Sequence, residues 1–308
     1  MPPWTALPRP TTPVCPPFEP SRPGKERNTI LVTGATGTIG RELVQQLKAS
    51  GAHVVAGSPS GKTIEGVETR RVDFAAAASL ASALQDVDTL FLLLPLQADM
   101  VQLASNAVAA ARTAGVKHIV RSSGAGADPA SPVSIARVQG QVDQLVIDSG
   151  IAWTLTRPNC FMQNYLTFYG DMVRAGALYL PQGDGKVSFI DVRDIAAVNA
   201  TILQRPDGHV GKVYSLTGGE ALSNAEATAR IGAALGRRID YVAVSDEAAI
   251  VSMRDAGMDD WSIEVLMSLS RIIAAGYVAG ISPDVAQLLG RAPGGFDRFV
   301  ADHLAAWR

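Results

Sequence analysis

The chain from residue 28 onward alternates short apolar runs with longer stretches of mixed polarity, at steps of roughly 25 residues. Within the apolar runs polar and apolar positions hardly alternate, which is typical of strands that are buried on both faces. The predicted strands span residues 29–33, 53–57, 69–72, 89–94, 118–122 and 152–157. This rhythm predicts an α/β fold in which helices cover both faces of a doubly wound parallel sheet.

Helices are predicted in the gaps between these strands. Residues 41–50 place their apolar side chains on one stripe, and Gly51 follows where a helix would end. The same reasoning predicts helices over residues 98–114 and 134–149, each of which is also followed by a glycine.

After residue 157 the alternation becomes irregular. Residues 187–203 and 212–219 each resemble a strand that rejoins the first sheet. Ser223 and Glu226 then form a capping-box pattern that opens a helix. A strand-like run over 238–244 and three further helical stretches follow, which predicts a smaller carboxyl-terminal lobe.

The composition excludes several classes of protein. With 47% apolar, 18% charged and 6% aromatic residues, the 308-residue chain is typical of a globular protein. A net charge of -2 leaves no basic field for a nucleic-acid backbone, so we expect no direct nucleic-acid partner. The longest apolar run, residues 90–96, is far below the roughly 20 residues that cross a bilayer, so we expect no membrane partner.

Cysteine and histidine usage points to a reducing compartment. Cys15 and Cys160 are too few for a disulfide framework, and no cluster of His and Cys has metal-ligand spacing. We therefore expect a cytoplasmic protein without a bound metal.

The strongest motif is a glycine-rich turn between the first predicted strand and the first predicted helix. Gly34, Gly37 and Gly40 would allow the tight turn, the approach of a pyrophosphate and the close packing of helix on strand. The remaining contacts of this cradle would come from Thr36, Thr38 and the amide of Ile39. Strand, turn and helix in this order predict a Rossmann-type dinucleotide site.

This motif sets the expected domain organisation. Residues 29–158, with 187–218 rejoining the sheet, would form the dinucleotide-binding domain, and residues 159–186 and 219–308 the substrate-binding lobe. Nine of the 18 prolines fall within the first 23 residues, so residues 1–28 are predicted to be a disordered leader, with docking to a polyproline-binding partner as the alternative.

The end of the second predicted strand bears on the choice of cofactor. NAD-preferring sites place a carboxylate there, and none is present. Ser58, Ser60 and Lys62 could instead accept a 2′-phosphate, although no arginine stands at this strand end. The sequence favours NADP(H) over NAD(H), and Arg41 is a second candidate partner for the phosphate.

Taken together, these residues resemble the NmrA-like branch of the short-chain dehydrogenase superfamily. That branch includes NAD(P)H-dependent quinone, azo-dye and triphenylmethane reductases alongside nucleotide-sensing regulators. The resemblance runs over residues 29–307 and is carried by TGATGTIGR, VDF, LFLLLP, VKHIVRSSGAGAD, WTLTRPNCFMQN, VSFIDVRDIA and GRAPGGFDRFVADHLAAW. It implies that Asp73 and Phe74 flank the adenine; the ribose would be bordered by Leu93, Leu94 and Pro95, and the nicotinamide by Pro158, Asn159 and Phe161.

The sequence departs from the superfamily at its acid pair. None of the six tyrosines has a lysine four residues on, so the Tyr-x-x-x-Lys pair is missing. The corresponding helix carries Gln139 and Asp143 one turn apart, and Ser123 stands at the family's serine position. Ser123 and Gln139 are the catalytic candidates, with a strand-end hydroxyl and a solvated helix polar as the alternative interpretations.

The missing pair restricts the chemistry. A simple ketone needs a nearby proton donor, whereas quinones, azo bonds and triaryl carbocations can delocalise the charge and take protons from water. The acceptor would stack in an apolar cleft built by some of Phe161, Met162, Tyr165, Phe168 and Tyr169, with Gln163 and Asn164 orienting it. Helical spacing of aromatic residues is more often typical of a core, so we expect only two or three of them to contact a ligand.

The family likeness also makes Asp191, Arg193 and Asp194 a strand-to-helix corner, with a capping aspartate and a local ion pair. Our leading interpretation is an NADPH-dependent reductase of a small aromatic or quinonoid substrate. The alternative is a non-catalytic NAD(P)-sensing regulator that acts through a protein partner. An isomerase or epimerase is disfavoured, because that chemistry also needs the missing pair.

Overall fold

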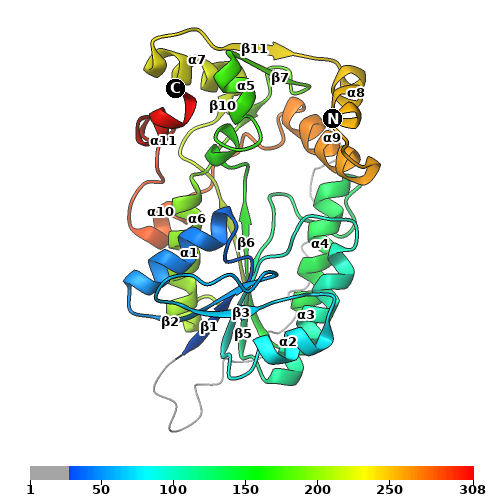
Figure 1. Ribbon diagram of the computed structural model, residues 1–308, viewed down its shortest axis with the longest axis vertical. Helices are drawn as coiled ribbons and strands as arrows, with labels where there is room; N and C mark the ends of the chain where they lie inside the picture. The colour runs from blue at the N-terminus through cyan, green and yellow to red at the C-terminus, as the bar shows by residue number, and fades with distance from the viewer. Residues whose placement is uncertain (1–27) are drawn as a thin grey trace.

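The computed structural model describes residues 28–308. The prediction of a disordered leader falls on residues 1–27 and therefore lies outside the described residues. From Asn28 onward the chain forms a sheet flanked by helices (Figure 1). A second lobe lies beyond the carboxyl ends of the strands of that sheet (Figure 1).

The central sheet has seven parallel strands in the order β3-β2-β1-β4-β5-β6-β9. Every residue of β1, β4 and β5 is buried, which explains why the sequence of these strands does not alternate. All six strands predicted from the apolar runs are confirmed, and a seventh joins them. The bounds are β1 Thr29–Val32, β2 His53–Ser58, β3 Glu68–Arg71, β4 Thr89–Leu92, β5 His118–Ser122, β6 Ala152–Pro158 and β9 Lys212–Leu216.

Helices cover both faces of this sheet (Figure 1). The three predicted helices are confirmed as α1, α3 and α4, and α3 ends at Gly115 in the left-handed conformation. One face carries α1 Thr38–Ala49, α6 Val192–Gln204 and α10 Asp284–Leu289; the other carries α2 Ala77–Ala83, α3 Met100–Ala114 and α4 Ser134–Ile147.

Two separate cores result from the alternation of side chains across the sheet. Ile30 and Val32 of β1 pack toward α1 and α6, whereas Leu31 packs toward α3 and α4. Each β1 residue is at most 4% exposed. This double burial fixes the positions of the strands, and with them the positions of the loops that follow the strands.

One sequence prediction is wrong. Residues 187–203 do not form a strand of the first sheet, because Asp191 caps the helix α6 and the apolar positions beyond it follow helical spacing. Only a short β8, Lys186–Val187, precedes this helix, and it pairs antiparallel with β10, Leu222–Ser223. The position beside β6 is taken by β9, as predicted from residues 212–219.

The second lobe contains a parallel pair of strands and a set of short helices around a core of its own. The capping box of Ser223 and Glu226 is confirmed at the start of α7. After β11 four α-helices follow where three helical stretches were predicted, and none within residues 28–308 is long and apolar enough to span a membrane. The remaining bounds are η1 Met162–Tyr165, α5 Gly170–Ala175, β7 Ala177–Leu180, η2 Pro206–Gly208, α7 Asn224–Leu235, β11 Asp240–Ala243, α8 Asp246–Asp255, α9 Asp260–Ala274, α11 Phe296–His303 and η3 Leu304–Trp307.

Candidate active site at the carboxyl ends of the strands

The carboxyl ends of the parallel strands meet at one edge of the sheet, where the chain order reverses between β1 and β4. Thr33 joins these two strand ends. Its hydroxyl oxygen lies 3.0 Å from the carbonyl oxygens of Phe91 and Leu93 and accepts a hydrogen bond from the Leu93 amide. The turn that follows β1 is therefore fixed against the end of β4.

Close packing of strand on helix shapes the glycine turn between β1 and α1. Gly34 has a positive φ of 64°, and its carbonyl oxygen accepts a hydrogen bond from the Gly37 amide at 2.9 Å. A Cβ at Gly40 would lie only 2.2 Å from that same carbonyl oxygen. Any side chain at Gly40 would thus force helix and strand apart.

The first turn of α1 is open to an anion. Gly37 is its N-cap, no side chain accepts from the amides there, and no acidic residue occupies the first turn. Among the described helices α6, α7, α8 and α9 are capped by an aspartate or serine side chain, whereas the others, like α1, have no side-chain cap. Thr38 is exposed and Thr36 partly exposed at this end, while Ile39 is buried. The chain thus brings together Gly34, Thr36, Gly37, Thr38, Ile39 and Gly40 in a cradle that fits a diphosphate.

The end of β2 lies beside this cradle. The Ser58 side chain is buried, and its hydroxyl has no hydrogen-bond partner. Ser60 and Lys62 are exposed in the following turn, where the Lys62 amide donates to the Ser60 hydroxyl at 3.3 Å. An unpaired buried hydroxyl next to an exposed cation suits a phosphate ester.

Sequence reasoning missed Arg71. The register of β2 and β3 pairs Ser58 with Arg71, so an arginine does stand next to this strand end, although on the neighbouring strand. Its side chain is 70% exposed, and its guanidinium lies 3.8 Å from the carboxylate of Asp73. The pairing of parallel strand ends is the signal that could have revealed it.

The residues that the resemblance assigned to adenine lie just beyond β3. Asp73 is partly buried, and its carboxylate accepts a hydrogen bond from the Ala75 amide at 3.0 Å. Phe74 is 9% exposed, and its carbonyl oxygen accepts from the amide of Asn106 on α3. Asp73 also lines a shallow surface hollow together with Arg71 and Ser79.

The residues assigned to the ribose differ from one another. Leu93 is partly exposed and lies against Gly34, where a Cβ would meet its side chain at 3.2 Å. Pro95 is exposed, whereas the Leu94 side chain packs into the core between the sheet and α3. The structure thus leaves Leu93 and Pro95 beside the cradle and turns Leu94 away from it.

The two catalytic candidates both stand near the carboxyl end of β5. Ser123 is buried, and its hydroxyl has no hydrogen-bond partner. Gln139 of α4 lies against the next residue, Gly124, where a Cβ would meet the Gln139 Cγ at 3.4 Å. The Gln139 side-chain oxygen accepts a hydrogen bond from the guanidinium of Arg121 at 2.6 Å. Gln139 is therefore not a freely solvated helix residue.

The end of β6 connects the sheet to the second lobe. Pro158 is the last residue of β6, and its carbonyl oxygen accepts from the Ala125 amide. Asn159 is buried, and its amide nitrogen donates to the Ser188 hydroxyl and the Val278 carbonyl oxygen, both at 2.8 Å. The Asn159 side chain is thus used within the protein, and Phe161, which is half-buried, is the more accessible of the three residues assigned to the nicotinamide.

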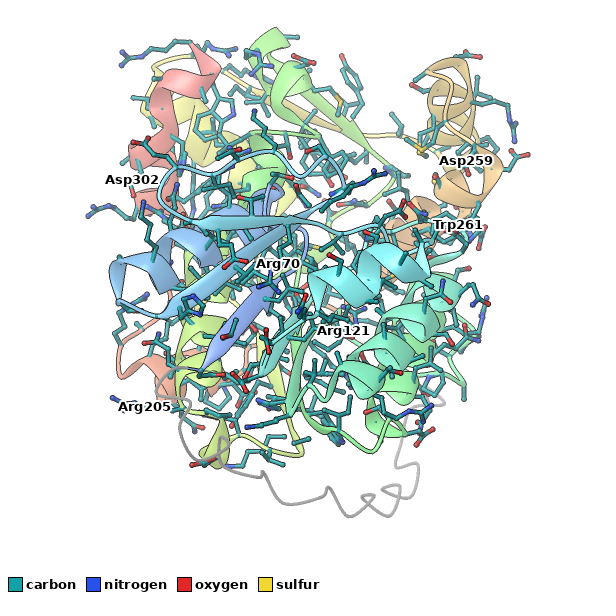
Figure 2. The ribbon with its side chains drawn as sticks, turned by 60° about the horizontal axis from the view of Figure 1, so that its bottom comes forward. Arg70, Arg121, Arg205, Asp259, Trp261 and Asp302 are labelled. Atoms are coloured by element: carbon teal, nitrogen blue, oxygen red, sulfur yellow. The ribbon has the colours of Figure 1, made fainter. Side chains whose placement is uncertain are left out.

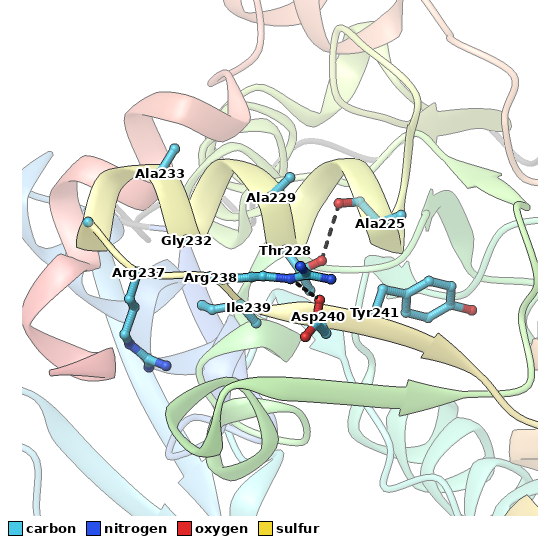
Figure 3. Close-up of a pocket in the computed structure, with 11 residues that line it drawn as sticks. Ala225, Thr228, Ala229, Gly232, Ala233, Arg237, Arg238, Ile239, Asp240 and Tyr241 are labelled. Carbon is cyan, nitrogen blue, oxygen red and sulfur yellow. Dashed lines mark hydrogen bonds and ion pairs between the residues drawn. The ribbon is translucent and has the colours of Figure 1, made fainter.

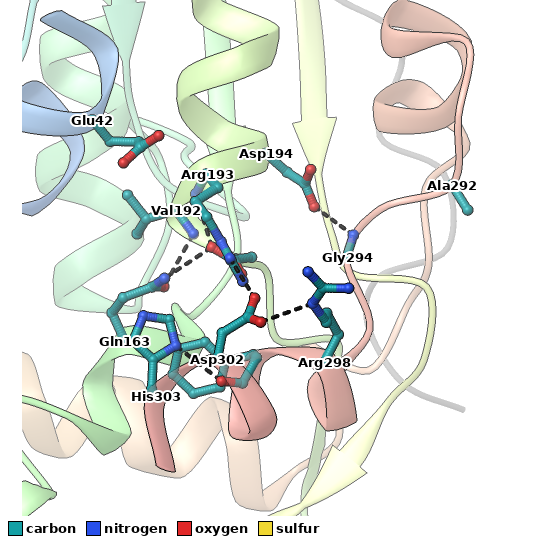
Figure 4. Close-up of polar contacts among 12 residues, drawn as sticks. Glu42, Gln163, Val192, Arg193, Asp194, Ala292, Gly294, Arg298, Asp302 and His303 are labelled. Atoms are coloured by element: carbon teal, nitrogen blue, oxygen red, sulfur yellow. Dashed lines mark hydrogen bonds and ion pairs between the residues drawn. The ribbon is translucent and has the colours of Figure 1, made fainter. Parts of the chain in front are cut away.

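Gln163 takes part in the strand-to-helix corner. Its amide nitrogen donates to Asp191 at 2.9 Å, and its oxygen accepts from the Val192 amide at 3.0 Å. Asp191 caps α6, and Arg193 pairs with both Asp191 and Asp302 (Figure 4). The structural role predicted for this corner is confirmed, whereas the Gln163 side chain is turned to it and not to an acceptor.

The charges of this corner are coupled. Burial alone would raise the pKa of Asp191, but hydrogen bonds from the Arg193 side chain and backbone and from Gln163 outweigh it and lower that pKa. Hydrogen bonds from Arg193 and Arg298 lower the pKa of Asp302 as well. Both carboxylates are therefore charged at neutral pH.

The aromatic residues after β6 are mostly core. Tyr165 is fully buried, and its hydroxyl donates to the side chain of Asn224 at 2.7 Å. Tyr165 packs edge to face against Tyr169, Phe189 and Phe296. The expectation that Tyr165 contacts a substrate is corrected here, because helical spacing placed it inside the second lobe.

Parts of this segment remain open to solvent. Phe168 is 78% exposed between η1 and α5, and Asn164 is partly exposed.

Burial raises the pKa of Tyr165 and of Tyr169, and it raises the pKa of the Cys160 thiol to about 12. These groups therefore keep their protons and do not act as acids or nucleophiles.

A separate hollow lies on the second lobe, between α7 and β11 (Figure 3). Alanines and glycines of α7 form much of its lining, and Arg238 pairs with Asp240 at its mouth. It has no glycine turn and no uncapped helix start, so the edge of the main sheet remains the candidate site.

These features define a class of protein. A strand, a glycine turn and an uncapped helix at the reversal point of a doubly wound parallel sheet are typical of dinucleotide-binding α/β proteins. Residues 26–289 match the NmrA-like family, and the chain belongs to that family. The resemblance given by the sequence motifs is confirmed.

Relatives and solved structures support this assignment. The chain is 41% identical to an NAD(P)H azoreductase of Xenophilus azovorans over 283 residues, which cover 90% of this chain and 99% of the relative. An NADPH-dependent quinone oxidoreductase of Escherichia coli, solved with NADPH, aligns with a TM-score of 0.79 at 27% identity, covering 89% and 99% of the two chains. A triphenylmethane reductase of Citrobacter sp., solved with NADP(H), aligns with a TM-score of 0.78 at 25% identity over 89% and 99% of the two chains.

Proposed function

We propose that this chain is an NADPH-dependent reductase that passes a hydride to a flat, conjugated, electron-poor acceptor. Quinones, azo compounds and triarylmethane dyes are the acceptors named by the three relatives above. The sheet domain, residues 29–158 completed by β9, holds the cofactor, and residues 159–186 and 219–308 contribute to the acceptor side. The protein acts in the cytoplasm.

The observation that carries this proposal is the cradle at the start of α1. A Cβ at Gly40 would overlap the Gly34 carbonyl oxygen, and the first-turn amides have no side-chain cap. An open helix start without an acidic side chain favours an anion, and a dinucleotide diphosphate fits it. The residues present therefore fit NADP(H).

The 2′-phosphate is read at the ends of β2 and β3. The Ser58 hydroxyl is buried without a partner, Lys62 is exposed in the next turn, and Arg71 is paired with Ser58 across the two strands. Two cations and a hydroxyl donor favour the phosphate of NADPH over the bare ribose of NADH.

Bound NADPH supplies a hydride, which carries two electrons to the acceptor. The chain supplies position and hydrogen bonds, because the Ser123 hydroxyl is unpaired at the end of β5 and Gln139 lies against the next residue, Gly124. No tyrosine hydroxyl stands there, and the described phenols of this region are buried with raised pKa values. Water therefore supplies the proton that completes a hydroquinone or a hydrazine.

The alternative is a nucleotide-sensing regulator. It is favoured by the burial of Tyr165 and the use of Gln163 in the α6 corner, which leave fewer side chains for an acceptor. A sensor would bind both redox forms of the cofactor and pass the state to a protein partner.

One experiment separates these proposals. Purified protein is titrated with NADPH by calorimetry and then mixed with NADPH and a panel of quinones, azo dyes and triarylmethane dyes, while the nicotinamide absorbance is followed. Steady consumption of NADPH that depends on the acceptor supports the reductase. Binding of both redox forms without consumption supports the sensor, and binding of neither form contradicts both.

A further inference from the structure

A layer of buried charge lies between α4 and the strands β5 and β6, directly below the candidate site. Arg121 of β5 is fully buried (Figure 2), and Asp143 of α4 is 2% exposed. Asp143 accepts hydrogen bonds from Arg157 of β6 at 2.9 and 3.2 Å. Burying a charged arginine costs desolvation free energy, so the contacts that offset this cost indicate the role of Arg121.

The contact that Arg121 makes by hydrogen bonding is with Gln139 and not with Asp143. Its Nη2 donates to the Gln139 side-chain oxygen at 2.6 Å. Burial lowers the pKa of Arg121 to about 10, against the opposing effect of Asp143, so the guanidinium is still charged at neutral pH. The hydrogen-bond acceptor of this buried cation is therefore a neutral amide.

This contact fixes the direction of the amide. A guanidinium has donors only, so Gln139 must turn its oxygen toward Arg121 and its NH2 group away. The stem of Gln139 lies against Gly124, and a Cβ at Gly124 would be 3.9 Å from the amide nitrogen. The NH2 group thus lies near Gly124 in the loop after β5. Gly124 directly follows Ser123, whose buried hydroxyl has no hydrogen-bond partner.

The helix that carries Gln139 is itself tightly held. A Cβ at Gly140 would lie 2.2 Å from the backbone of Asp128 and Pro129, so α4 packs directly on this loop. The Asp128 amide also donates to the carbonyl oxygen of Ala136. Gln139 is therefore positioned from the strand side by Arg121 and from the loop side by this close contact.

We propose that Arg121 is a positioning residue that holds the NH2 group of Gln139 toward the acceptor, and that this donor selects acceptors bearing an oxygen or nitrogen at the reacting end. The inference rests on the proposed function. When a quinone receives the two electrons of a hydride, negative charge grows on its carbonyl oxygen, and a fixed N–H donor stabilises that charge. A triarylmethyl cation receives the hydride on carbon and becomes neutral, so it has no use for this donor.

The test is the variant Gln139→Glu, assayed with one quinone and one triarylmethane dye. A carboxylate keeps the contact with Arg121 but offers no N–H donor. We expect kcat/KM to fall about 10- to 100-fold with the quinone, mainly in kcat, and by less than about 3-fold with the dye. The Kd of NADPH, measured by calorimetry, should stay unchanged.

Three arginine variants complete the test. Arg121→Met should show the same quinone-selective loss, and Arg121→Lys, which retains a donor, should recover part of it. Arg157→Met removes a cation from the same layer without touching Gln139, so its effect should be equal on both acceptors. Thermal unfolding separates loss of fold from loss of selectivity.

The outcomes are distinct. Equal losses on both acceptors, or undiminished quinone turnover by Gln139→Glu, would overturn the role of Arg121 and Gln139 while leaving the reductase intact. A wild-type protein that binds NADPH but reduces neither acceptor would overturn the proposed function, and this inference with it.

Discussion

The position of Arg71 next to Ser58 is evident from the pairing of β2 and β3 and not from the sequence around Arg71. Arg71 stands at the end of β3, yet the strand register places it opposite Ser58 of β2, whose buried hydroxyl has no partner. The Arg71 side chain is mostly exposed, and its guanidinium lies 3.8 Å from the carboxylate of Asp73. Because most of the side chain is exposed, the guanidinium is available to a phosphate.

We predict that Arg71→Ala weakens NADPH binding about 10-fold and leaves NADH binding unchanged, because only NADPH carries the 2′-phosphate. Isothermal titration of both cofactors measures this. Arg205→Ala, which removes an equal charge beyond the carboxyl end of α6 (Figure 2), is the matched control. An equal loss for both cofactors would show that Arg71 does not read the phosphate.

Other residues could not be placed from sequence. The aromatic spacing after β6 suits both a cleft wall and a core, and only tertiary packing shows that Tyr165 is enclosed by Phe189 and Phe296. Gln163 could not be assigned to the α6 corner, because its partners Asp191 and Val192 are 28 and 29 residues away in the chain.

At the scale of elements, the junction of β1 and α1 was fully predictable. Three glycines at fixed spacing specify a turn in which helix and strand touch, and the structure shows that contact at Gly34 and Gly40. The segment 187–203 was not predictable in the same way, because three of its first four residues are apolar and β-prone. Only the capping geometry of Asp191 decides for a helix.

We predict that Gly40→Ala lowers NADPH affinity at least about 10-fold and destabilises the fold by about 1–3 kcal/mol, because its Cβ would overlap the Gly34 carbonyl oxygen. Calorimetry and denaturant unfolding measure the two effects. Gly208→Ala is the control, since a Cβ there would meet nothing within 4 Å. Unchanged NADPH affinity in Gly40→Ala would contradict the cradle.

The buried histidine of β5 predicts that the folded protein loses stability in acid. His118 is buried, and desolvation, with a smaller effect of His209, lowers its pKa to about 4 from the ordinary 6.5. The unfolded chain takes up a proton at a pH where the folded protein does not, so stability is lost as pH falls from about 6.5 to about 4. The shift corresponds to about 3 kcal/mol.

We therefore expect His118→Gln to lose about 3 kcal/mol less unfolding free energy than the wild type between pH 7 and pH 4. Urea unfolding at a series of pH values measures this loss. His53→Gln, at an exposed position at the start of β2, is the control. Parallel pH curves for His118→Gln and the wild type would exclude His118 as the source.

At the scale of the whole molecule, two lobes share one chain that crosses between them repeatedly. The Ser134 hydroxyl of α4 donates to Glu264 of α9, and the Ile135 amide donates to Ser268. On the other side, Asp194 of α6 accepts from the Gly294 amide and pairs with Arg291. The second lobe is thus held against both helical layers of the sheet.

The sheet was predictable because β1, β2, β4, β5 and β6 are each specified by a nearly continuous buried run of residues. The second lobe was predictable only as a lobe, because its elements are short and its contacts join distant segments, such as β7 with β11. The nucleotide half of the site is built by the sheet, whereas the acceptor half depends on the second lobe. This explains why the cofactor was easier to predict than the acceptor.

The central claim is hydride transfer from NADPH to a conjugated acceptor at the carboxyl edge of the sheet. The most direct measurement uses NADPH carrying deuterium at both hydrogens of the nicotinamide C4, with a triarylmethane dye as acceptor in ordinary water. We predict that mass spectrometry finds one deuterium on the central carbon of the leuco dye, matched by one NADP+ formed per dye reduced. A leuco dye without deuterium, or NADPH that is bound and never oxidised, would contradict the account.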